Sequence, residues 1–136
     1  MPFKFEQLDV WQLSLDYSDQ IYEVAEKLPE SERFNLKSQI TRAATSISLN
    51  IAEGSTGQSD PEQNRFLGMA VRSLIETVAC QRLISRRKYI TDKTLMEQLD
   101  LKAQELAKRL HAFRKSLVNS KKSISEEQAF YETDEH

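Results

Sequence analysis

The 136-residue chain has little cysteine, glycine, proline or histidine, and each shortage excludes a class of protein. Its single cysteine, Cys80, excludes an internal disulfide and any metal site built from several cysteines. It has three glycines and three prolines, and the stretches 3–28, 30–53 and 69–136 contain neither, so the turn residues that many short strands or phosphate-binding loops need are missing. These shortages leave a few long helices as the expected architecture.

Long apolar runs are also missing. No run approaches the roughly 18 residues that a membrane-spanning helix needs, and the first ten residues do not read as a signal peptide. Charged residues make up 29% of the chain and hydrophobic residues 39%, which is the balance of a soluble domain. The sequence therefore predicts one cytoplasmic domain without a membrane partner.

Charge is unevenly distributed, although the net charge is only −2. Residues 1–32 hold two lysines and eight acidic residues, whereas residues 102–122 hold seven basic residues and one glutamate. Residues 123–136 add five acidic residues and no basic one. A basic helix end therefore lies between an acidic first helix and an acidic tail.

Hydrophobic periodicity predicts four helices. The first three are expected over about 6–28, 36–54 and 60–88, and the fourth from a cap at Thr91 or Asp92 to about 119. Ser59, followed by Asp60 and Pro61, reads as the capped start of the third helix. Gly54 suits the left-handed turn that follows many helices.

Four long helices with short connections predict an all-α fold, namely an antiparallel up-down four-helix bundle over residues 1–119. We expect residues 120–136 to form a disordered acidic tail.

The first and third helices each carry a second apolar row that one bundle seam does not bury. Exposed rows of this size usually mark a subunit interface, so we expect a homo-oligomer. The alternative is a wide stripe facing the core of a single chain. The residues of the predicted oligomer interface are Leu8, Trp11, Leu15, Tyr22, Ile75, Ala79 and Leu83.

Polar residues recur at steps of three and four on the second helix. They are Gln39, Arg42, Ser46, Asn50 and Glu53. An unpaired buried polar group costs about 1–3 kcal/mol, so a row that faces another helix must find partners. We interpret it as structural, fixing helix register or a subunit contact, with a ligand site as the alternative.

Catalytic signatures are weak. A nucleophile needs a nearby base, and the two histidines are His111, among basic residues, and His136, the last residue. The loop from Gly54 to Gly57 lacks the lysine and spacing of a P-loop, so an ordinary connection is the simpler interpretation. We predict no enzyme, no catalytic residue, no cofactor and no metal, and keep a small hydrolase or metal enzyme as the alternative.

Basic residues near the ends of the third and fourth helices are the best indication of a partner. They are Arg82, Arg86, Arg87, Lys88, Lys108, Arg109, Arg114 and Lys115. Positive charge near a helix C-terminus also complements the helix dipole, which is the purely structural interpretation. If oligomer symmetry repeats both groups, they predict phosphate contacts with nucleic acid.

Two runs of residues are similar to a known family. The second helix contains Gln39-Ile40-Thr41-Arg42-Ala43-Ala44 and then Asn50-Ile51-Ala52-Glu53-Gly54, and the third contains Arg65-Phe66-Leu67. Over about 5–118 the chain resembles the four-helix-bundle proteins encoded by intervening sequences of bacterial large-subunit ribosomal RNA genes. It departs from their pattern at Phe34, Thr41, Ser48 and Arg72. Thr41 replaces the first of two arginines, which weakens any inference of binding through the second helix.

The resemblance implies a homopentameric barrel of four-helix bundles without known catalytic activity. Relatives of that family, the accessory variability determinant proteins of diversity-generating retroelements, imply a positively charged pentamer that binds RNA or DNA and a reverse transcriptase. Our first hypothesis is thus a non-enzymatic, homo-oligomeric scaffold that binds nucleic acid. The second is a protein-interaction ring with no nucleic-acid role, whose acidic first helix and tail recruit a basic partner.

Overall fold

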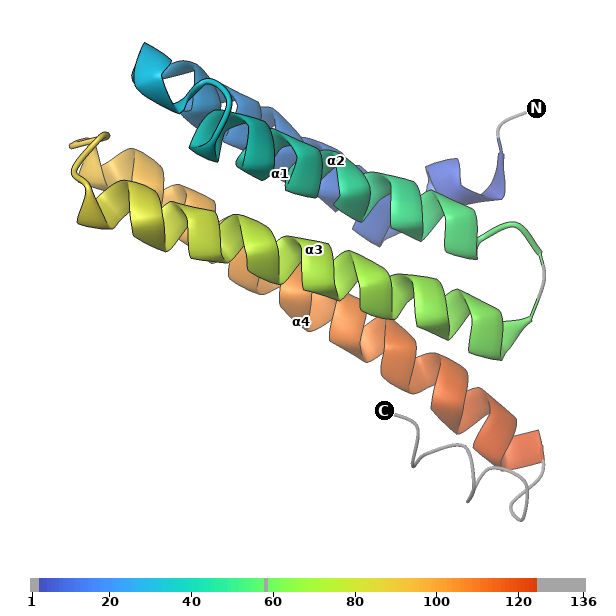
Figure 1. Ribbon diagram of the computed structural model, residues 1–136. Helices are drawn as coiled ribbons and strands as arrows, with labels where there is room; N and C mark the ends of the chain where they lie inside the picture. The colour runs from blue at the N-terminus through green and yellow to red at the C-terminus, as the bar shows by residue number, and fades with distance from the viewer. Residues whose placement is uncertain (1–2, 58, 125–136) are drawn as a thin grey trace.

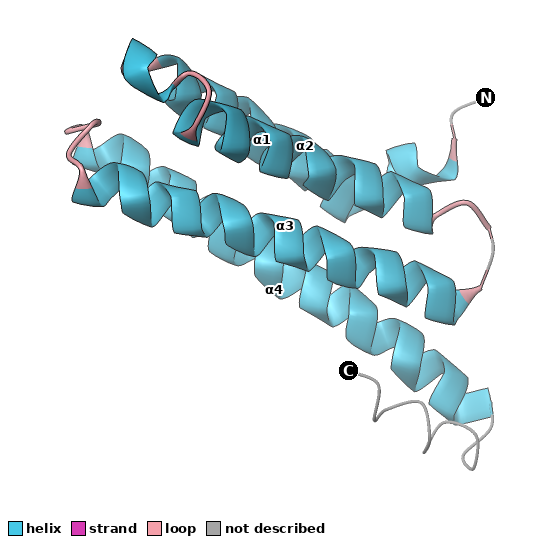
Figure 2. Cartoon of the chain, viewed as in Figure 1, coloured by secondary structure: helices cyan, strands magenta, loops and turns pink. Residues whose placement is uncertain are grey.

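The computed structural model describes residues 3–57 and 59–124, and they form an all-α bundle (Figure 1). The chain runs through a short 3-10 helix η1 (Lys4–Gln7), α1 (Asp9–Glu26), a 3-10 turn η2 (Glu30–Glu32), α2 (Leu36–Gly54), α3 (Asp60–Arg86) and α4 (Lys93–Ile124). Short loops join successive helices at alternate ends of the bundle (Figure 2). The predicted four-helix bundle is confirmed.

Local capping explains where the helices begin. The Ser59 hydroxyl accepts the Glu62 N–H at the start of α3, and the Asp92 carboxylate accepts the Leu95 N–H at the start of α4. Both capped starts are therefore confirmed, and Asp92 is the cap of the fourth helix. The first helix begins three residues later than predicted, because η1 takes up residues 4–7 and Glu6 accepts the Phe3 N–H.

The fourth helix continues past the predicted boundary at 119, and the structure describes it as far as Ile124. Residues 119–124 contain no glycine or proline that would interrupt the helix. The remainder of the predicted acidic tail, residues 125–136, lies outside the described residues.

A single hydrophobic core runs along the bundle axis and is built from all four helices. Its largest fully buried side chains include Ile21 of α1, Ile47 of α2, Leu74 of α3 and Leu106 of α4. Burying a side chain of this size stabilises the fold by about 1.5–3 kcal/mol. Hydrophobic burial therefore supplies the main force that holds the helices together.

Small residues let α2 pack closely against both of its neighbours. The Ser14 and Ser48 hydroxyls are hydrogen-bonded at 2.9 Å between α1 and α2, and the Ser73 hydroxyl donates to Ser46 at 2.8 Å between α3 and α2. Contact between α2 and α3 is the most extensive in the bundle, whereas contact between α1 and α4 is the least extensive among helices that are neighbours in the bundle. The α2–α3 pair is thus the most tightly packed part of the fold.

Helix α2 ends at Gly54, but the prediction that Gly54 adopts the left-handed turn after the helix is wrong. Gly54 is the last residue of α2, and its backbone is not left-handed. Gly57, in the following loop, has a left-handed backbone with φ 88°. A Cβ on Gly54 would lie 2.9 Å from the Phe66 Cβ and 3.3 Å from the Gln63 carbonyl oxygen. Glycine is therefore needed there for the close approach of α3, not for a turn.

A chain of hydrogen bonds crosses the core between α1 and α3. The Gln81 amide donates to the Tyr17 hydroxyl at 2.7 Å, which leaves that hydroxyl to donate to Thr77 at 2.7 Å, and Thr77 in turn donates to the Leu74 carbonyl. Burial raises the pKa of Tyr17 to about 12. The Gln81 Oε1 atom is buried without a hydrogen-bond partner among the described residues.

Candidate functional site

The structure separates the predicted nucleic-acid-binding residues into two groups at opposite ends of the α3–α4 hairpin. Arg82, Arg86, Arg87 and Lys88 lie beside the α3–α4 loop and are exposed. The α4 group lies toward the other end, where Arg114 donates to Asn64 of α3 at 2.8 Å. Asn64 is 18 residues before Arg82 on α3, or about 27 Å along the helix axis at about 1.5 Å per residue. One chain therefore does not gather these residues into one patch.

Six of the eight predicted residues are exposed and make no ion pair with any other described residue. They are Arg86, Arg87, Lys88, Lys108, Arg109 and Lys115. The other two have partners within the fold. Arg82 forms an ion pair with Asp100 at 2.9 Å, and the Arg114 guanidinium packs over Gly68, where a Cβ would lie 3.1 Å from it.

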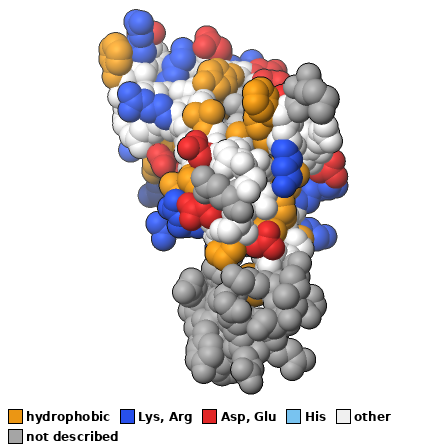
Figure 3. Space-filling view, turned by 90° about the vertical axis from the view of Figure 1, so that its right-hand side faces the viewer, with side chains coloured by type: hydrophobic (Ala, Val, Ile, Leu, Met, Phe, Trp, Pro, Cys, Tyr) orange, Lys and Arg blue, Asp and Glu red, His pale blue; other side chains and the backbone are white. Residues whose placement is uncertain are grey.

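Both signs of charge are mixed at the end of the bundle that carries the α2–α3 loop. Figure 3 shows lysine, arginine and acidic side chains there, with hydrophobic side chains between them. Two of the arginines are held locally, since Arg65 pairs with Glu62 and Arg114 is bonded to Asn64. This end therefore does not present a uniformly positive surface.

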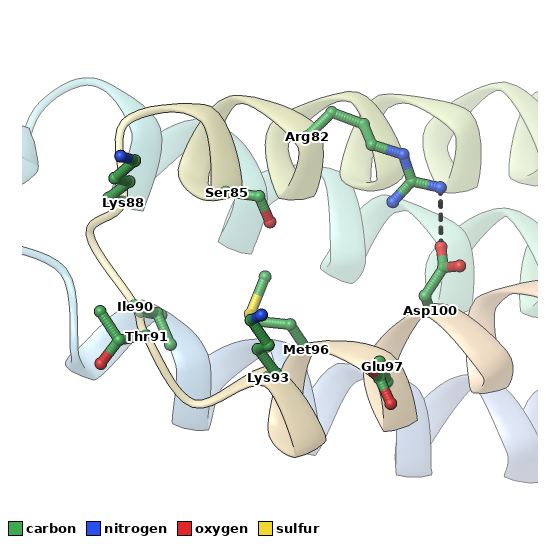
Figure 4. A pocket seen from close by; sticks show the side chains of 9 residues that line it. All are labelled: Arg82, Ser85, Lys88, Ile90, Thr91, Lys93, Met96, Glu97 and Asp100. Carbon is green, nitrogen blue, oxygen red and sulfur yellow. Dashed lines mark hydrogen bonds and ion pairs between the residues drawn. The ribbon is translucent and has the colours of Figure 1, made fainter.

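A pocket of about 550 Å³ lies between the end of α3, the α3–α4 loop and the start of α4. Figure 4 shows Ser85 facing it from α3, Lys93 and Met96 facing it from α4, and Lys88 at the turn. The Arg82–Asp100 ion pair lies at its far side (Figure 4). The full lining is Arg82, Ser85, Lys88, Ile90, Thr91, Lys93, Met96, Glu97 and Asp100.

Lys88 adopts a left-handed backbone, with φ 58°. The Tyr89 N–H donates to the Ile84 carbonyl and the Lys88 N–H donates to the Ser85 carbonyl, which is the hydrogen-bond pattern of a Schellman motif. Glycine usually takes the left-handed position of this motif, because a side chain there strains the backbone. The pocket is therefore bordered by a lysine in an unfavourable conformation.

The α3–α4 loop is tied to the α1–α2 connection by the buried carboxylate of Glu32. This carboxylate accepts the Tyr89 hydroxyl at 2.7 Å, the Asn35 side-chain amide at 2.9 Å and the Leu36 N–H at 3.3 Å. The Tyr89 hydrogen bond contributes most to holding the pKa of Glu32 below its ordinary value, and it raises the pKa of Tyr89. The pair fixes the loop that forms one side of the pocket.

The predicted interface rows differ in exposure. On α3, Ile75 is 62% exposed and Leu83 is 45% exposed, and Ala79 between them is exposed as well. Of the predicted α1 row, Tyr22 is exposed, at 46%, and the other three members are not. Leu8 and Trp11 pack against the core and Leu15 is half-buried, so the α1 row is largely covered by its own chain.

The polar row of α2 is only partly tied together. The Asn50 amide donates to the Ser46 carbonyl and hydroxyl, and Ser46 accepts from Ser73 of α3. Gln39 bonds instead to Asn35 at the start of the helix. The two charged members of the row, Arg42 and Glu53, are exposed.

Groups suited to catalysis do not converge. Within residues 3–57 and 59–124, no three His, Cys, Asp or Glu side chains are placed to hold a metal ion. His111 is exposed, and Cys80 is a buried thiol whose pKa is raised by burial and by the nearby Glu76.

Sequence reasoning missed the pocket and the Glu32–Tyr89 pair. The hydrogen-bonded side chains of that pair are 57 residues apart, and no local pattern connects them. Lys93 could have indicated the pocket from the sequence. It follows the Asp92 cap and therefore lies across a short loop from the basic end of α3.

A family model and a solved structure both relate the chain to the same kind of protein. A family model described as "23S rRNA-intervening sequence protein" matches residues 6–112. A solved structure from Bacteroides thetaiotaomicron, described as a protein of unknown function from the S23 ribosomal protein family, is 30% identical. The match covers 78% of this chain and 98% of that one, with a TM-score of 0.71. No curated protein matches the chain, and none of its described helices is long and apolar enough to cross a membrane.

Proposed function

Because the chain belongs to the family of 23S rRNA-intervening sequence proteins, we propose that it is a non-enzymatic scaffold that assembles with its own copies and binds structured RNA. The observation that carries the proposal is the set of six exposed basic side chains that lack an ion pair with any other described residue. Phosphates are the partners that such side chains bind most readily, by displacing counterions.

Self-association completes the site. The two basic groups of one chain lie toward opposite ends of the α3–α4 hairpin, with Arg82 about 27 Å along the helix axis from Asn64, the partner of Arg114. Neither end alone therefore offers more than a few contacts. Symmetric copies joined through the exposed apolar row of α3 would repeat each group around a common axis. An assembly of this kind binds a phosphate backbone with little sequence preference, in the cytoplasm where such RNA occurs.

The test is the salt dependence of RNA affinity, measured by fluorescence anisotropy with a labelled RNA hairpin. The logarithm of the affinity should fall linearly with the logarithm of salt concentration. The double variant Arg86→Gln/Arg109→Gln should flatten the slope by about one to two units. Its matched control is Arg33→Gln/Arg65→Gln, which removes two exposed arginines that already pair with Glu30 and Glu62. A flat slope for the wild type, or equal losses in both variants, contradicts the proposal.

A second candidate is a protein-interaction ring without a nucleic-acid role. The observation that favours it is an acidic surface on α1, where Asp9, Asp16, Asp19 and Glu23 are all exposed. This surface suits a basic protein partner. Pull-downs that survive nuclease and are lost on Asp16→Asn/Asp19→Asn would favour it over RNA binding. A reverse transcriptase is the partner that the resemblance to retroelement proteins implies, and it stays a prediction.

A further inference from the structure

We propose that the α3–α4 loop pocket binds the C-terminal segment, residues 125–136, of a second copy of this chain. The proposal concerns a contact between protein chains and shares one residue, Lys88, with the proposed RNA-binding surface. Its test contains no RNA, so its outcome is separate from that of the RNA-binding test.

The pocket combines apolar side chains with three basic and two acidic ones. Asp100 is neutralised by its ion pair with Arg82. Lys88 and Lys93 together with Glu97 therefore leave the lining with one net positive charge. Ile90 and Met96 are half-buried and form its apolar part, whereas Lys88 and Lys93 are exposed at its edge without an ion pair to any described residue. Its volume of about 550 Å³ is in the range of pockets that hold small ligands and peptide side chains. Its occupant should therefore present an apolar group with carboxylates beside it.

The end of the chain has this chemistry. Phe130 and Tyr131 are adjacent aromatic residues, and five acidic residues surround them with no lysine or arginine after residue 122. Aromatic rings make favourable contacts with methionine sulfur, so either ring suits the Met96 side of the pocket. The flanking carboxylates suit Lys88 and Lys93.

Chain length decides that the occupant comes from another copy. The pocket lies at the start of α4 and the segment begins at its end, on the opposite side of the bundle (Figure 1). Met96 and Ile124 are 28 residues apart, or about 42 Å at about 1.5 Å per residue. The six residues from 125 to 130 span at most about 22 Å when fully extended. Phe130 therefore does not reach the pocket of its own chain.

The strained backbone of Lys88 supports a binding role for this pocket. Glycine would relieve the left-handed position at no steric cost, yet the position carries a charged side chain that lines the pocket. Strained backbone positions cluster at ligand-binding sites.

The experiment measures binding of a fluorescent peptide of residues 125–136 to the full-length chain carrying Phe130→Ser/Tyr131→Ser, which removes competition from the protein's own segment. Fluorescence anisotropy should show saturable binding that weakens as salt is added. Adding Lys88→Ser/Lys93→Ser should weaken binding roughly tenfold, the sum of two surface ion pairs. A peptide with Phe130→Ser/Tyr131→Ser should not saturate.

The matched control is Lys108→Ser/Lys115→Ser, which removes the same charge from α4 away from the pocket. Its affinity for the peptide should stay within about twofold of the parent chain, because the pocket is untouched. Three outcomes overturn the proposal: no saturable binding up to millimolar peptide, an equal loss in both lysine variants, or equal binding of the serine peptide. Circular dichroism confirms that each variant keeps its helices.

Discussion

At the scale of single residues, Gly54 and Lys88 occupy positions where the residue type differs from the one that the local backbone favours. Gly54 is needed because Phe66 approaches it from α3, and Lys88 occupies a position where glycine would be unstrained. Gly54 is a glycine within a helix, where glycine is an unfavourable residue. Lys88 is a lysine at a left-handed position, where glycine is the favourable one.

Replacing Lys88 with glycine should stabilise the fold. A left-handed backbone costs an ordinary residue about 1–2 kcal/mol, and part of this is offset by the greater freedom of glycine in the unfolded chain. We expect Lys88→Gly to raise the free energy of unfolding by about 0.5–1 kcal/mol, measured by urea denaturation. Lys88→Ala is the control, since it removes the charge and keeps the Cβ. An equal gain from Lys88→Ala would show that backbone strain is not the cause.

Capping could be predicted from the sequence, whereas these two positions could not. Ser59 and Asp92 bond to amides three residues away, so their role is visible in a short stretch of sequence. The reason for Gly54 lies on another helix, and Lys88 gives no sign in the sequence of its backbone conformation.

At the scale of helices and loops, buried polar side chains fix how the elements meet. Tyr17, Thr77 and Gln81 join α1 to α3 across the core, and Glu32 and Tyr89 join two connections at one end of the bundle. Apolar periodicity predicted the four helices but not these pairings, because the bonded residues are about 60 positions apart. Among the hydrogen bonds between described residues, Ser46 is the member of the predicted polar row of α2 that bonds to another helix.

The Tyr17 hydroxyl should contribute measurably to stability. Tyr17→Phe leaves the Gln81 amide without its acceptor, at an expected cost of about 1–3 kcal/mol by urea denaturation. Adding Gln81→Met removes the stranded amide together with its unpartnered Oε1, so the double variant should lose less than the sum of the single changes. Strict additivity would contradict the coupling.

The same hydroxyl predicts a pH dependence. The pKa of Tyr17 is about 12 in the folded chain and near 10.0 without burial, so between these values the unfolded chain binds fewer protons than the folded one. Stability should fall with rising pH in this window by about 1.4 kcal/mol per pH unit. Denaturation at pH 9 and 11 should show a smaller loss in Tyr17→Phe than in the wild type.

Glu32 should make stability rise with pH in the acidic range, opposite to the effect of Tyr17 at high pH. Its folded pKa lies below the ordinary value of 4.5, so its contribution is present above that value and is lost as pH falls through the folded pKa. Tyr89→Phe removes the strongest cause of this shift, and the midpoint of acid unfolding should move to higher pH. Tyr22→Phe, which affects an exposed hydroxyl bonded to Thr45, is the control and should leave the midpoint unchanged.

At the scale of the whole molecule, Ile75, Ala79 and Leu83 of α3 form an apolar row that one chain leaves uncovered. The predicted α1 row is mostly packed against its own core, so the wide core-facing stripe describes α1 better than α3. Periodicity did not distinguish the α1 row from the α3 row. It identifies apolar residues on one helix face, but it does not show whether η1 or the core covers that face.

Breaking the α3 row should change the mass in solution. Light scattering should give about 79 kDa for five copies of the 15.7 kDa chain, as the resemblance implies. Ile75→Asp puts a charge into the predicted interface and should reduce the mass to that of one chain. Leu49→Asp is the matched control, because Leu49 is 60% exposed on α2, outside the row, and its mass should stay unchanged. A wild-type chain that is already a monomer would contradict the interface.

The uneven packing of the bundle has a consequence for its fluctuations. The seam between α1 and α4 has the least contact, and Gln20 faces a shallow hollow there with its buried Oε1 unpartnered among the described residues. Local opening begins where the fewest interactions must break. Backbone amide protons in the middle of α1 and α4 should therefore exchange with deuterium sooner than those of α2 and α3, which would persist as the last protected hairpin.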